Sequence, residues 1–383
     1  MKYIDEIDVK GKKVIVRVDY NVPIKDGIIE DDNRIKKSLT TINYLLENNA
    51  KIILLSHLGK VKTEEDKQKN SLKVVSEHLG KLLNMNIIFS EETRGKKLDE
   101  LVNNMKEKDI ILVENTRYED VSNKLESNCD ENLSKYWASL GDIFVLDAFA
   151  SAHRNHASTY GIAKYIKGYA GFLIKEELNV LKEVFQNKNK DILLGGAKVE
   201  DKIGVITNLI QNSNSVLLGG AMCFTFLKAK GYNVGLSFVD EERLKYAKEL
   251  IEKYPNKIIL PIDIVTENEV KDIDKISNND IGYDIGPKTI EKYKEILSKS
   301  NLVVWNGPLG WFENEKYAKG TKDILYYLHD NNIKTVIAGG DTGNAANQYG
   351  LKFFYISTGG GATLEYLEGK EFQTLEVLEK WKK

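Results

Sequence analysis

Ten short runs rich in isoleucine, leucine and valine recur along the chain, and they restrict its possible folds more than any other feature. Runs of this kind are typical of β-strands that are buried on both faces of a sheet. Between them lie amphipathic stretches with helical periodicity, for example residues 35–49 and 71–84. Strands that alternate with helices predict an α/β fold, in which parallel sheets are covered by helices on both faces. The ten runs are KVIVRVDYN (13–21), KIILLSHLGK (51–60), DIILVENTRY (109–118), DIFVLDAFA (142–150), DILLGGAK (191–198), SVLLGGAM (215–222), KIILPIDIVT (257–266), NLVVWNGPLG (301–310), KTVIAGGDT (334–342) and FFYISTGGG (353–361).

The length of the chain predicts two domains. Its 383 residues exceed the roughly 250–300 residues that one hydrophobic core usually serves. We therefore expect two doubly wound, Rossmann-like parallel-sheet domains joined by a hinge helix. The stretch AGFLIKEELNVLKEVFQNK predicts that helix, because Leu178, Leu181 and Phe185 recur at helical spacing. The expected divisions are an N-terminal domain at 1–168, the interdomain helix at 169–187 and a C-terminal domain at 188–365.

The overall composition excludes several classes of protein. A net charge of −2 provides no general attraction to nucleic acid or to an anionic membrane, so any anion site must be local. The start, MKYIDEIDVKGKK, carries acidic residues where a signal peptide is apolar, and the apolar runs are shorter than the ~18 residues needed to span a bilayer. We therefore expect a cytoplasmic protein. Cys129 and Cys223 cannot build a disulfide framework or a zinc quartet, and we expect both to be free thiols.

Arginine is rare in this chain, and its placement indicates local anion recognition. The guanidinium group can grip a carboxylate or phosphate with two parallel hydrogen bonds, which lysine cannot do. Five of the six arginines lie in the first 160 residues. The 55 basic residues include only Arg17, Arg34, Arg94, Arg117, Arg154 and Arg243 as arginines.

The residues that directly follow each apolar run differ between the two halves of the chain. These residues matter most, since ligands of parallel α/β sheets bind beyond the carboxyl ends of the strands. In the N-terminal half they are cationic or hydrogen-bonding side chains, and in the C-terminal half they are glycine-rich. Glycine allows a ligand to approach the backbone, and the N-termini of the following helices offer free N–H groups to anions. The tips of the first four runs carry Asp19 with Asn21, His57 with Lys60, Arg117, and Asp147 leading to His153 and Arg154. The remaining tips are GGAK, GGAM, PIDIVT, NGPLG, GGDT and TGGG.

The segment VLDAFASAHRNHAST, residues 145–159, carries two of the five histidines and one arginine. A metal site, a catalytic base and an anion clamp are all candidate roles for it. A zinc site at His153 and His156 lacks further ligands at a familiar spacing, so the anion clamp is favoured. The segment HRN resembles the start of a protein-kinase catalytic loop, but no DFG motif or glycine loop accompanies it.

The glycine-rich half contains neither GxxxxGK[ST] nor GxGxxG, so it is not a common P-loop or a dinucleotide fingerprint. Lys198 and Lys202 could form an anion site beside a glycine turn, or a solvated helix face. Asp341 could cap the following helix or hold Mg²⁺ carried by a nucleotide. Glu313 could be a plain surface charge, and the glycines at 359–361 could simply form a tight turn.

Taken together, the motifs closely resemble phosphoglycerate kinase along nearly the whole chain. The resemblance implies an N-terminal domain that binds 3-phosphoglycerate or 1,3-bisphosphoglycerate and a C-terminal domain that binds ADP or ATP with Mg²⁺. It further implies hinge closure, and a final segment, 366–383, that returns to the N-terminal domain. The motifs are RVDYNVP, SHLGK, VENTRY, DAFASAHRNHAS, GGAKVEDKI, GGAMCFTFLK, LPIDIVT, DIGPKT, VVWNGPLGWFE, GGDT and STGGGATLEYLEGK.

The resemblance also implies roles for individual residues. The triose contacts would be Asp19, Asn21, Arg34, His57, Lys60, Arg117 and Arg154, with His153 supporting them. The nucleotide contacts would be Gly196, Lys198, Lys202, Gly219, Gly220, Asn306, Glu313 at the ribose, Gly340, Asp341 at the metal and Thr342 at a phosphate. The groups that compensate the charge of the transferring phosphoryl, and so act in catalysis, would be Arg34, Lys198 and the helix N-terminus at Gly360.

Two positions depart from the family's pattern. Lys60 stands where the family usually has arginine, which bears on phosphate binding, and Trp311 stands where a smaller apolar residue is common, which bears on the shape of the nucleotide site. The resemblance implies reversible transfer of a phosphoryl group between 1,3-bisphosphoglycerate and ADP, by a monomer without nucleic-acid or membrane partners. Two alternatives remain open at this stage: another ATP-dependent kinase of carboxylates, and a nucleotide-binding regulatory protein without turnover.

Overall fold

The computed structural model describes residues 1–267 and 269–381, which form two compact units. Unit 1 consists of Met1–Leu178 and the chain from Glu371 onward, and unit 2 consists of Asn179–Lys370. The division along the chain falls within helix α6 (Phe172–Gln186). The C-terminal return begins at Glu371, after helix α13 (Gly361–Leu367), which belongs to unit 2. Residues 382–383, at the end of the predicted returning segment, lie outside the described residues.

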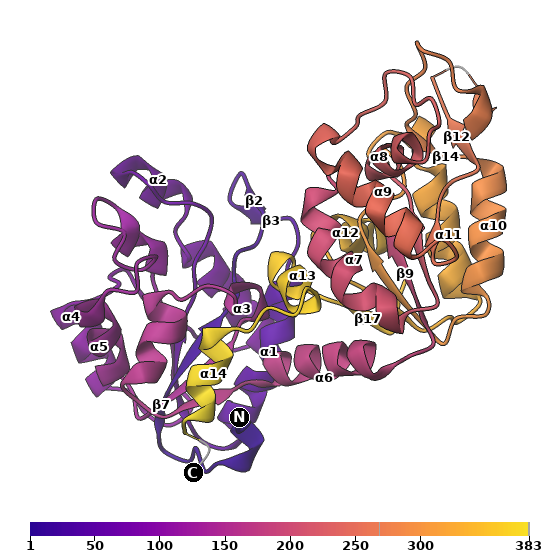
Figure 1. Ribbon diagram of the computed structural model, residues 1–383. Coiled ribbons are helices and arrows are strands. Elements are labelled where there is room, and N and C mark those ends of the chain that lie inside the picture. The colour runs from indigo at the N-terminus through magenta and orange to yellow at the C-terminus, as the bar shows by residue number, and fades with distance from the viewer. Residues whose placement is uncertain (268, 382–383) are drawn as a thin grey trace. The chain divides into compact units, whose positions relative to one another are not determined.

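Unit 1 is built on a six-stranded sheet in which every neighbouring pair of strands is parallel (Figure 1). Four of the predicted runs form its centre, and their continuous burial explains why they lack polar alternation. The edge strands have only three residues each and lie outside the ten predicted runs. In order across the sheet, the strands are β5 (Ile88–Ser90), β6 (Ile110–Val113), β4 (Lys51–Leu55), β1 (Lys13–Val18), β7 (Ile143–Asp147) and β8 (Gly168–Ala170).

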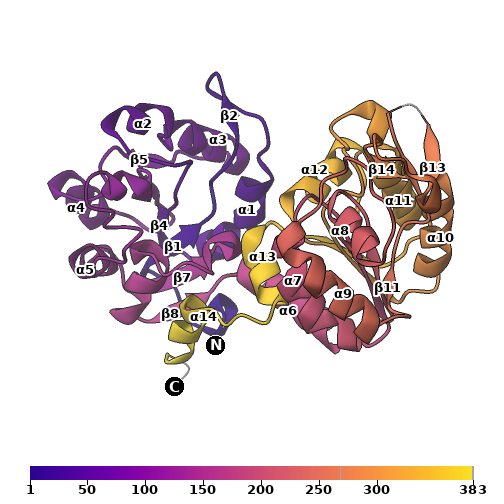
Figure 2. The ribbon, with the colours of Figure 1, turned by 45° about the horizontal axis from the view of Figure 1, so that its top comes forward.

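Helices cover both faces of this sheet, as Figure 2 shows for α1 and α3 on one side and α4 and α5 on the other. On the first face, Val16 of β1 belongs to the same hydrophobic cluster as Ile42 of α1 and Leu79 of α3. The C-terminal helix α14 belongs to this unit: the indole N–H of Trp381 just after it donates to the carbonyl of Ala163 at 3.0 Å. A short antiparallel hairpin pairs β2 (Ile24–Lys25) with β3 (Ile28–Ile29). The helices are α1 (Asn33–Glu47), α2 (Glu64–Lys69), α3 (Lys73–Leu83), α4 (Lys96–Asn103), α5 (Glu131–Ser139) and α14 (Gln373–Glu379).

Unit 2 contains a second six-stranded sheet, also parallel throughout. One prediction about its strands is wrong. The run 257–266 is not a single strand, because the chain leaves the parallel sheet after Ile259 and enters a separate antiparallel sheet beyond Pro261. Proline lacks the N–H that a strand needs, so the change of sheet occurs there. The parallel strands in order are β11 (Ile258–Ile259), β10 (Ser215–Leu218), β9 (Lys190–Leu194), β15 (Leu302–Asn306), β16 (Thr335–Ile337) and β17 (Tyr355–Ile356), and the antiparallel ones are β13 (Val270–Asp272), β12 (Asp263–Val265) and β14 (Asp284–Ile285).

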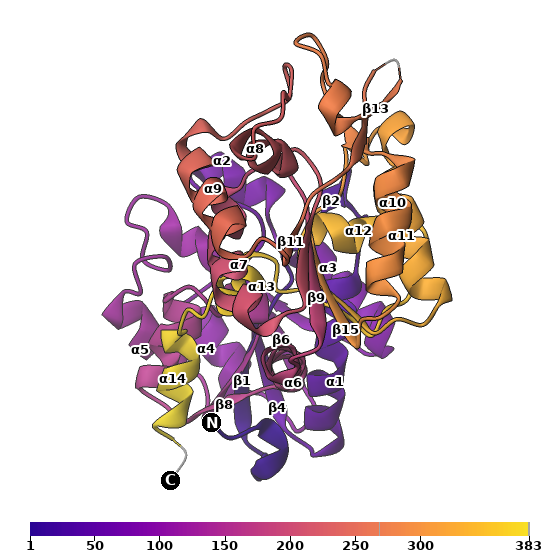
Figure 3. The same ribbon diagram turned by 45° about the vertical axis from the view of Figure 1, so that its right-hand side comes forward.

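The sheet of unit 2 is also covered on both faces, which confirms the predicted doubly wound α/β class for both units. Figure 3 shows α10 and α11 on one side of the strands and α7 and α9 on the other. Trp305 of β15 is fully buried in one cluster with Tyr293 of α10 and Leu328 of α11. The helices are α7 (Ile203–Leu209), α8 (Met222–Ala229), α9 (Leu244–Lys253), α10 (Pro287–Leu297), α11 (Lys319–Asp330), α12 (Gly340–Gln348) and α13, given above.

Candidate functional site

Unit 2 contains a cavity of about 370 Å³ at the carboxyl ends of β9, β15, β16 and β17, which we call the glycine-rich cavity. β9 and β15 are neighbours at the centre of the sheet, where the strand order reverses, and such a switch point is where open α/β sheets bind ligands. Eight predicted site residues line it: Gly196, Lys198, Lys202, Asn306, Gly340, Asp341, Thr342 and Gly360.

The glycines of GGAM, Gly219 and Gly220, do not line this cavity but pack against the loops that form it. Gly220 lies so close to the GGAK turn that a Cβ atom there would be 2.5 Å from the backbone nitrogen of Gly196. Gly220 also adopts a φ of +61°, a conformation that favours glycine. A Cβ atom on Gly219 would be 2.8 Å from the side chain of Leu309. Both glycines therefore allow two loops to pack together.

Hydrogen bonds fix the side chains of two residues that line the cavity. The hydroxyl of Thr342 accepts the backbone N–H of Gly307 at 2.9 Å. The side-chain amide of Asn306 donates to the carbonyl of Ala338, while its Oδ1 atom is buried and has no hydrogen-bond partner among the described residues. A buried acceptor of this kind is costly unless something donates to it. The lining of the cavity thus includes one buried acceptor that no described residue satisfies.

The cavity is suited to an anion. Gly340, Asp341 and Thr342 are the first three residues of α12, and the backbone N–H groups at the start of a helix favour negative charge. Lys198 is exposed at the rim and Lys202 is partly buried. Burial lowers the pKa of Lys202, and the negative charges of Asp201 and Asp341 partly offset this decrease. Two lysines and a helix N-terminus therefore face one cavity.

Asp341 does not cap α12, so the capping alternative is wrong. The N-cap residue is Gly339, and no side chain among the described residues forms a cap hydrogen bond there. The carboxylate of Asp341 is exposed and lines the cavity instead. Asp201 lines the same cavity and was missed by the sequence analysis. It could have been considered, because it lies between the two lysines in GGAKVEDK.

Glu313 lies outside the lining of the glycine-rich cavity, on an exposed loop that continues from Pro308. The nearby Trp311 is half-exposed and stacks on Tyr317, with ring centroids 6.0 Å apart. Tyr317 in turn stacks on Tyr283 at 4.4 Å. The role of Glu313 at a ribose stays a prediction.

In unit 1, Asp19, Asn21 and Arg34 meet at the carboxyl end of β1. The guanidinium Nη1 of Arg34, near the start of α1, lies 2.9 Å from Oδ2 of Asp19 and donates to the carbonyl of Asn21 at 3.2 Å. The side-chain oxygen of Asn21 accepts the backbone N–H of Gly59 at 2.8 Å. The loop after β1 is therefore tied to the loop after β4, which carries His57 and Lys60.

Four arginines lie close enough to His57 to act on its charge, and we call them the arginine cluster: Arg17, Arg34, Arg117 and Arg154. Burial lowers its pKa well below the ordinary value, and the positive charges of these four arginines lower it further. His57 is therefore a neutral imidazole at physiological pH. Arg17, buried within β1, contacts His57 directly and is a residue to which the sequence analysis assigned no role.

The other predicted residues of unit 1 differ in their surroundings. Arg117 lies 3.6 Å from Oδ2 of Asp120, and its Nε atom is buried without a hydrogen-bond partner among the described residues. Arg154 is exposed, and its Nε donates to Nε2 of His153 at 3.0 Å. Lys60 is exposed, and no ion pair links it to another described residue.

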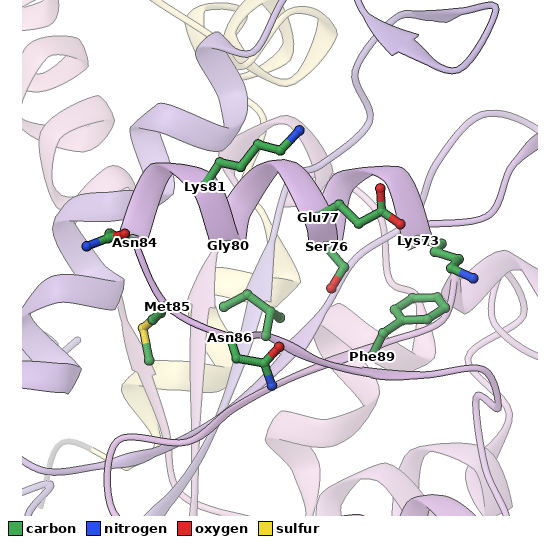
Figure 4. Close-up of a pocket in the computed structure, with 10 residues that line it drawn as sticks. Lys73, Ser76, Glu77, Gly80, Lys81, Asn84, Met85, Asn86 and Phe89 are labelled. Carbon is green, nitrogen blue, oxygen red and sulfur yellow. The ribbon is translucent and has the colours of Figure 1, made fainter.

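A larger groove of about 580 Å³ lies elsewhere in unit 1, between α3 and the segment that leads into β5 (Figure 4). Ser76 points into it, whereas the ammonium group of Lys81 points away from it. It contains no predicted site residue, so size alone does not identify the functional site.

In residues 1–267 and 269–381, no group of three or more metal-ligating side chains (His, Cys, Asp or Glu) is placed to hold a metal ion. Over the same residues, no helix is both long and apolar enough to span a membrane.

Both units are built on parallel sheets. Unit 1 has clustered arginines, and unit 2 has a glycine- and lysine-lined anion cavity at a switch point. Together these features define a nucleotide-dependent phosphotransferase. The comparison with known proteins agrees with this class. The family model described as "Phosphoglycerate kinase" matches residues 4–370. The chain therefore belongs to the phosphoglycerate kinase family, and it is a kinase of glycolysis.

Individual relatives match along nearly their whole length. The phosphoglycerate kinase of Fusobacterium nucleatum is 49% identical over 98% of this chain and 99% of that protein. That of Enterococcus faecalis is 50% identical over 96% of both chains. Among solved structures, phosphoglycerate kinase from Coxiella burnetii has a TM-score of 0.88 at 34% identity, covering 99% of this chain and 98% of that one.

Proposed function

We propose that this enzyme transfers a phosphoryl group reversibly between 1,3-bisphosphoglycerate and ADP, with the triose bound by unit 1 and the nucleotide by unit 2. The observation that carries the proposal is the glycine-rich cavity, which is lined by Lys198, Lys202 and the first residues of α12. This arrangement compensates the charge of nucleotide phosphates. The arginine cluster of unit 1 supplies the separate anion site that a phosphorylated carboxylate requires.

Charge compensation and substrate binding are assigned to different residues. A phosphoryl group in transfer spreads its negative charge over its oxygens, so alignment and charge compensation supply most of the catalysis. Arg34 and Lys198 are the cations that we assign to this task, with the backbone N–H groups around Gly360. A carboxylate leaving group needs no general acid, which agrees with a neutral His57. His57 therefore binds substrate and does not transfer a proton.

Magnesium fits the glycine-rich cavity as a companion of the nucleotide. Mg²⁺ is commonly held by one or two carboxylates together with substrate phosphates, and not by a cage made only of protein groups. The cavity offers the carboxylates of Asp341 and Asp201, and the former is free of any capping role. When bound, the ion would neutralise negative charge on the phosphates of the nucleotide. Asp341 is the residue that we assign to hold it.

Direct transfer requires the two substrates to meet, and water must be excluded because an acyl phosphate hydrolyses. We therefore expect the two units to close around their ligands during turnover. We also expect the enzyme to act as a cytoplasmic monomer. The small net charge supports the expectation that it has no nucleic-acid partner. Light scattering after size exclusion tests the monomer.

A coupled assay tests the proposal and separates it from its alternatives. ATP-dependent phosphorylation should occur with 3-phosphoglycerate and not with acetate or glycerate, which lack the phosphate that the arginine cluster would bind. Arg117→Ala should raise KM for 3-phosphoglycerate, and Lys202→Ala should raise KM for ATP. Equal activity with acetate would indicate a different carboxylate kinase, and nucleotide binding without turnover would indicate a regulatory protein.

A further inference from the structure

Arg17 occupies an unusual place for a charged side chain. It lies within the central strand β1, and only 1% of it is exposed. Each nitrogen of its guanidinium group has a partner: Nε donates to the hydroxyl of Ser158 at 2.9 Å, Nη1 to the carbonyl of Val18, and Nη2 contacts Nδ1 of His57 at 3.0 Å. A fork with three fixed contacts is held in one orientation.

The contact with His57 determines which ring nitrogen carries the proton. A guanidinium group has only donors, so Nη2 must donate and Nδ1 of His57 must accept. A neutral imidazole that accepts at Nδ1 carries its proton at Nε2. No described residue forms a hydrogen bond with Nε2 in the structure, so this N–H remains for a ligand.

A buried carboxylate lies at the other end of the same chain of contacts. The hydroxyl of Ser158, which accepts from Arg17, donates to Oε1 of Glu126 at 2.5 Å, and the Ser158 backbone N–H donates to Oε2 at 2.9 Å. Glu126 is fully buried. The burial of a charge is costly unless it is compensated, and here the two opposite charges are linked through one hydroxyl group.

We propose that Arg17 is a positioning residue that fixes His57 in the tautomer with its proton on Nε2, and that Glu126, acting through Ser158, holds Arg17 in place. His57 then donates a hydrogen bond to an anionic oxygen of the substrate, whereas the other tautomer would present a lone pair and repel it. This inference rests on the proposed triose site for its effect on substrate, but the tautomer itself does not depend on that function.

The surroundings of His57 support this assignment. Burial and the charges of the arginine cluster lower its pKa, which excludes the doubly protonated ring that would repel Arg17. Lysine could replace the charge of Arg17, but one ammonium group cannot reproduce a planar fork to Ser158, Val18 and His57 together. In a chain whose ordinary cation is lysine, arginine at this position is therefore a geometric requirement.

The test compares the wild type with Arg17→Lys, Ser158→Ala and a control, Tyr136→Phe, which removes a part-buried hydroxyl that bonds to Asp99 in the same unit. Long-range proton–nitrogen spectra of ¹⁵N-histidine protein report the tautomer, and His57→Gln identifies its signals among the five histidines. KM for 3-phosphoglycerate and for ATP is measured on each variant.

We expect an unprotonated Nδ1 in the wild type and in Tyr136→Phe, and a mixture of tautomers in Arg17→Lys. Loss of one charge-assisted hydrogen bond should raise KM for 3-phosphoglycerate roughly tenfold in Arg17→Lys, with KM for ATP nearly unchanged. Ser158→Ala should shift both readouts in the same direction, and it provides the test if Arg17→Lys does not fold. A proton on Nδ1 in the wild type, or an unaltered tautomer in the folded variants, would overturn the proposal. An enzyme inactive toward 3-phosphoglycerate would instead contradict the proposed function, and the spectra would still decide the role of Arg17.

Discussion

Nη1 of Arg34 lies 2.9 Å from Oδ2 of Asp19, and the carboxylate is almost fully buried while the arginine is about one-third exposed. The Nη1 atom of Arg34 is fixed by two contacts, because it also donates to the Asn21 carbonyl. No described residue accepts a hydrogen bond from Nε or Nη2 of Arg34. The fork is thus oriented by one nitrogen and has two left for an anionic ligand.

Arg34→Ala should therefore lower kcat strongly while KM for ATP stays nearly constant. Loss of charge stabilisation at a transition state typically costs about 2.7–4 kcal/mol, or roughly 10²–10³ in rate. Steady-state kinetics with both substrates measure the effect. Arg94→Ala is the matched control, since Arg94 is an arginine of the same unit that pairs with Glu119 and has no assigned role. Near-normal turnover in Arg34→Ala would remove Arg34 from the catalytic groups.

Asp341→Ala should weaken the use of magnesium without loss of stability. The N-cap of α12 is Gly339, so the loss of about 0.5–2 kcal/mol that follows removal of a capping side chain is not expected. A magnesium titration of activity and a thermal melt on one variant measure the two effects. Asp201→Asn tests the other carboxylate of the cavity. If the melting temperature of Asp341→Ala fell and its magnesium dependence did not change, Asp341 would be structural.

The fold could be predicted from the sequence where strands are buried on both faces. Such strands are continuous apolar runs, and the four central strands of unit 1 and β9, β10 and β15 of unit 2 all follow that pattern. The edge strands β5 and β8 were not predicted, because each has three residues and neither lies within one of the ten apolar runs. The change of sheet at Pro261 was visible in the sequence as a proline inside an apolar run, and it is the signal that the prediction overlooked.

The lining of the glycine-rich cavity was predictable where a charged residue lies four residues beyond the end of a strand, as Lys198 and Asp341 do. Arg17 was not, because it lies inside the run KVIVRVDYN and its partner His57 is forty residues further along the chain. Glu126 and Ser158 were missed for the same reason: their importance follows from contacts between distant segments. Gly219 and Gly220 were found through resemblance, and the structure shows that they support the cavity without lining it.

Asp147 should make stability depend on pH. It is fully buried at the end of β7, and its Oδ1 accepts the backbone N–H of Leu173 at the start of α6 at 2.9 Å. Burial raises its pKa from 3.8 to about 7, against the effect of the hydrogen bonds it accepts. Between these two values the folded state binds a proton that the unfolded state releases. Stability should therefore fall as pH rises through this window and become constant above it.

Asp147→Asn should remove this dependence, because an amide oxygen can still accept the hydrogen bond and cannot ionise. Between pH 5 and pH 8 the wild type should lose about 3 kcal/mol more free energy of unfolding than the variant does. Urea titrations at the two pH values measure it. The buried carboxylate of Asp284, whose pKa burial raises to about 7, contributes equally to both proteins and cancels in the difference. Equal losses would show that Asp147 is ionised throughout this range.

Lys60 should bind the phosphate of the triose as a point charge, without the paired, directional hydrogen bonds of a guanidinium group. It is exposed on the loop after β4, and no described residue pairs with it. An ammonium group attracts phosphate but cannot make two coplanar hydrogen bonds, so Lys60→Arg should tighten 3-phosphoglycerate binding by about 1 kcal/mol. Lys60→Ala should weaken binding, most clearly at low salt, where the electrostatic attraction is least screened. Calorimetric titration at two salt concentrations measures these affinities, with Lys62→Ala, an exposed lysine of the same loop, as the control. Three equal affinities for the wild type and the two Lys60 variants would leave the phosphate to His57, Arg117 and Arg154.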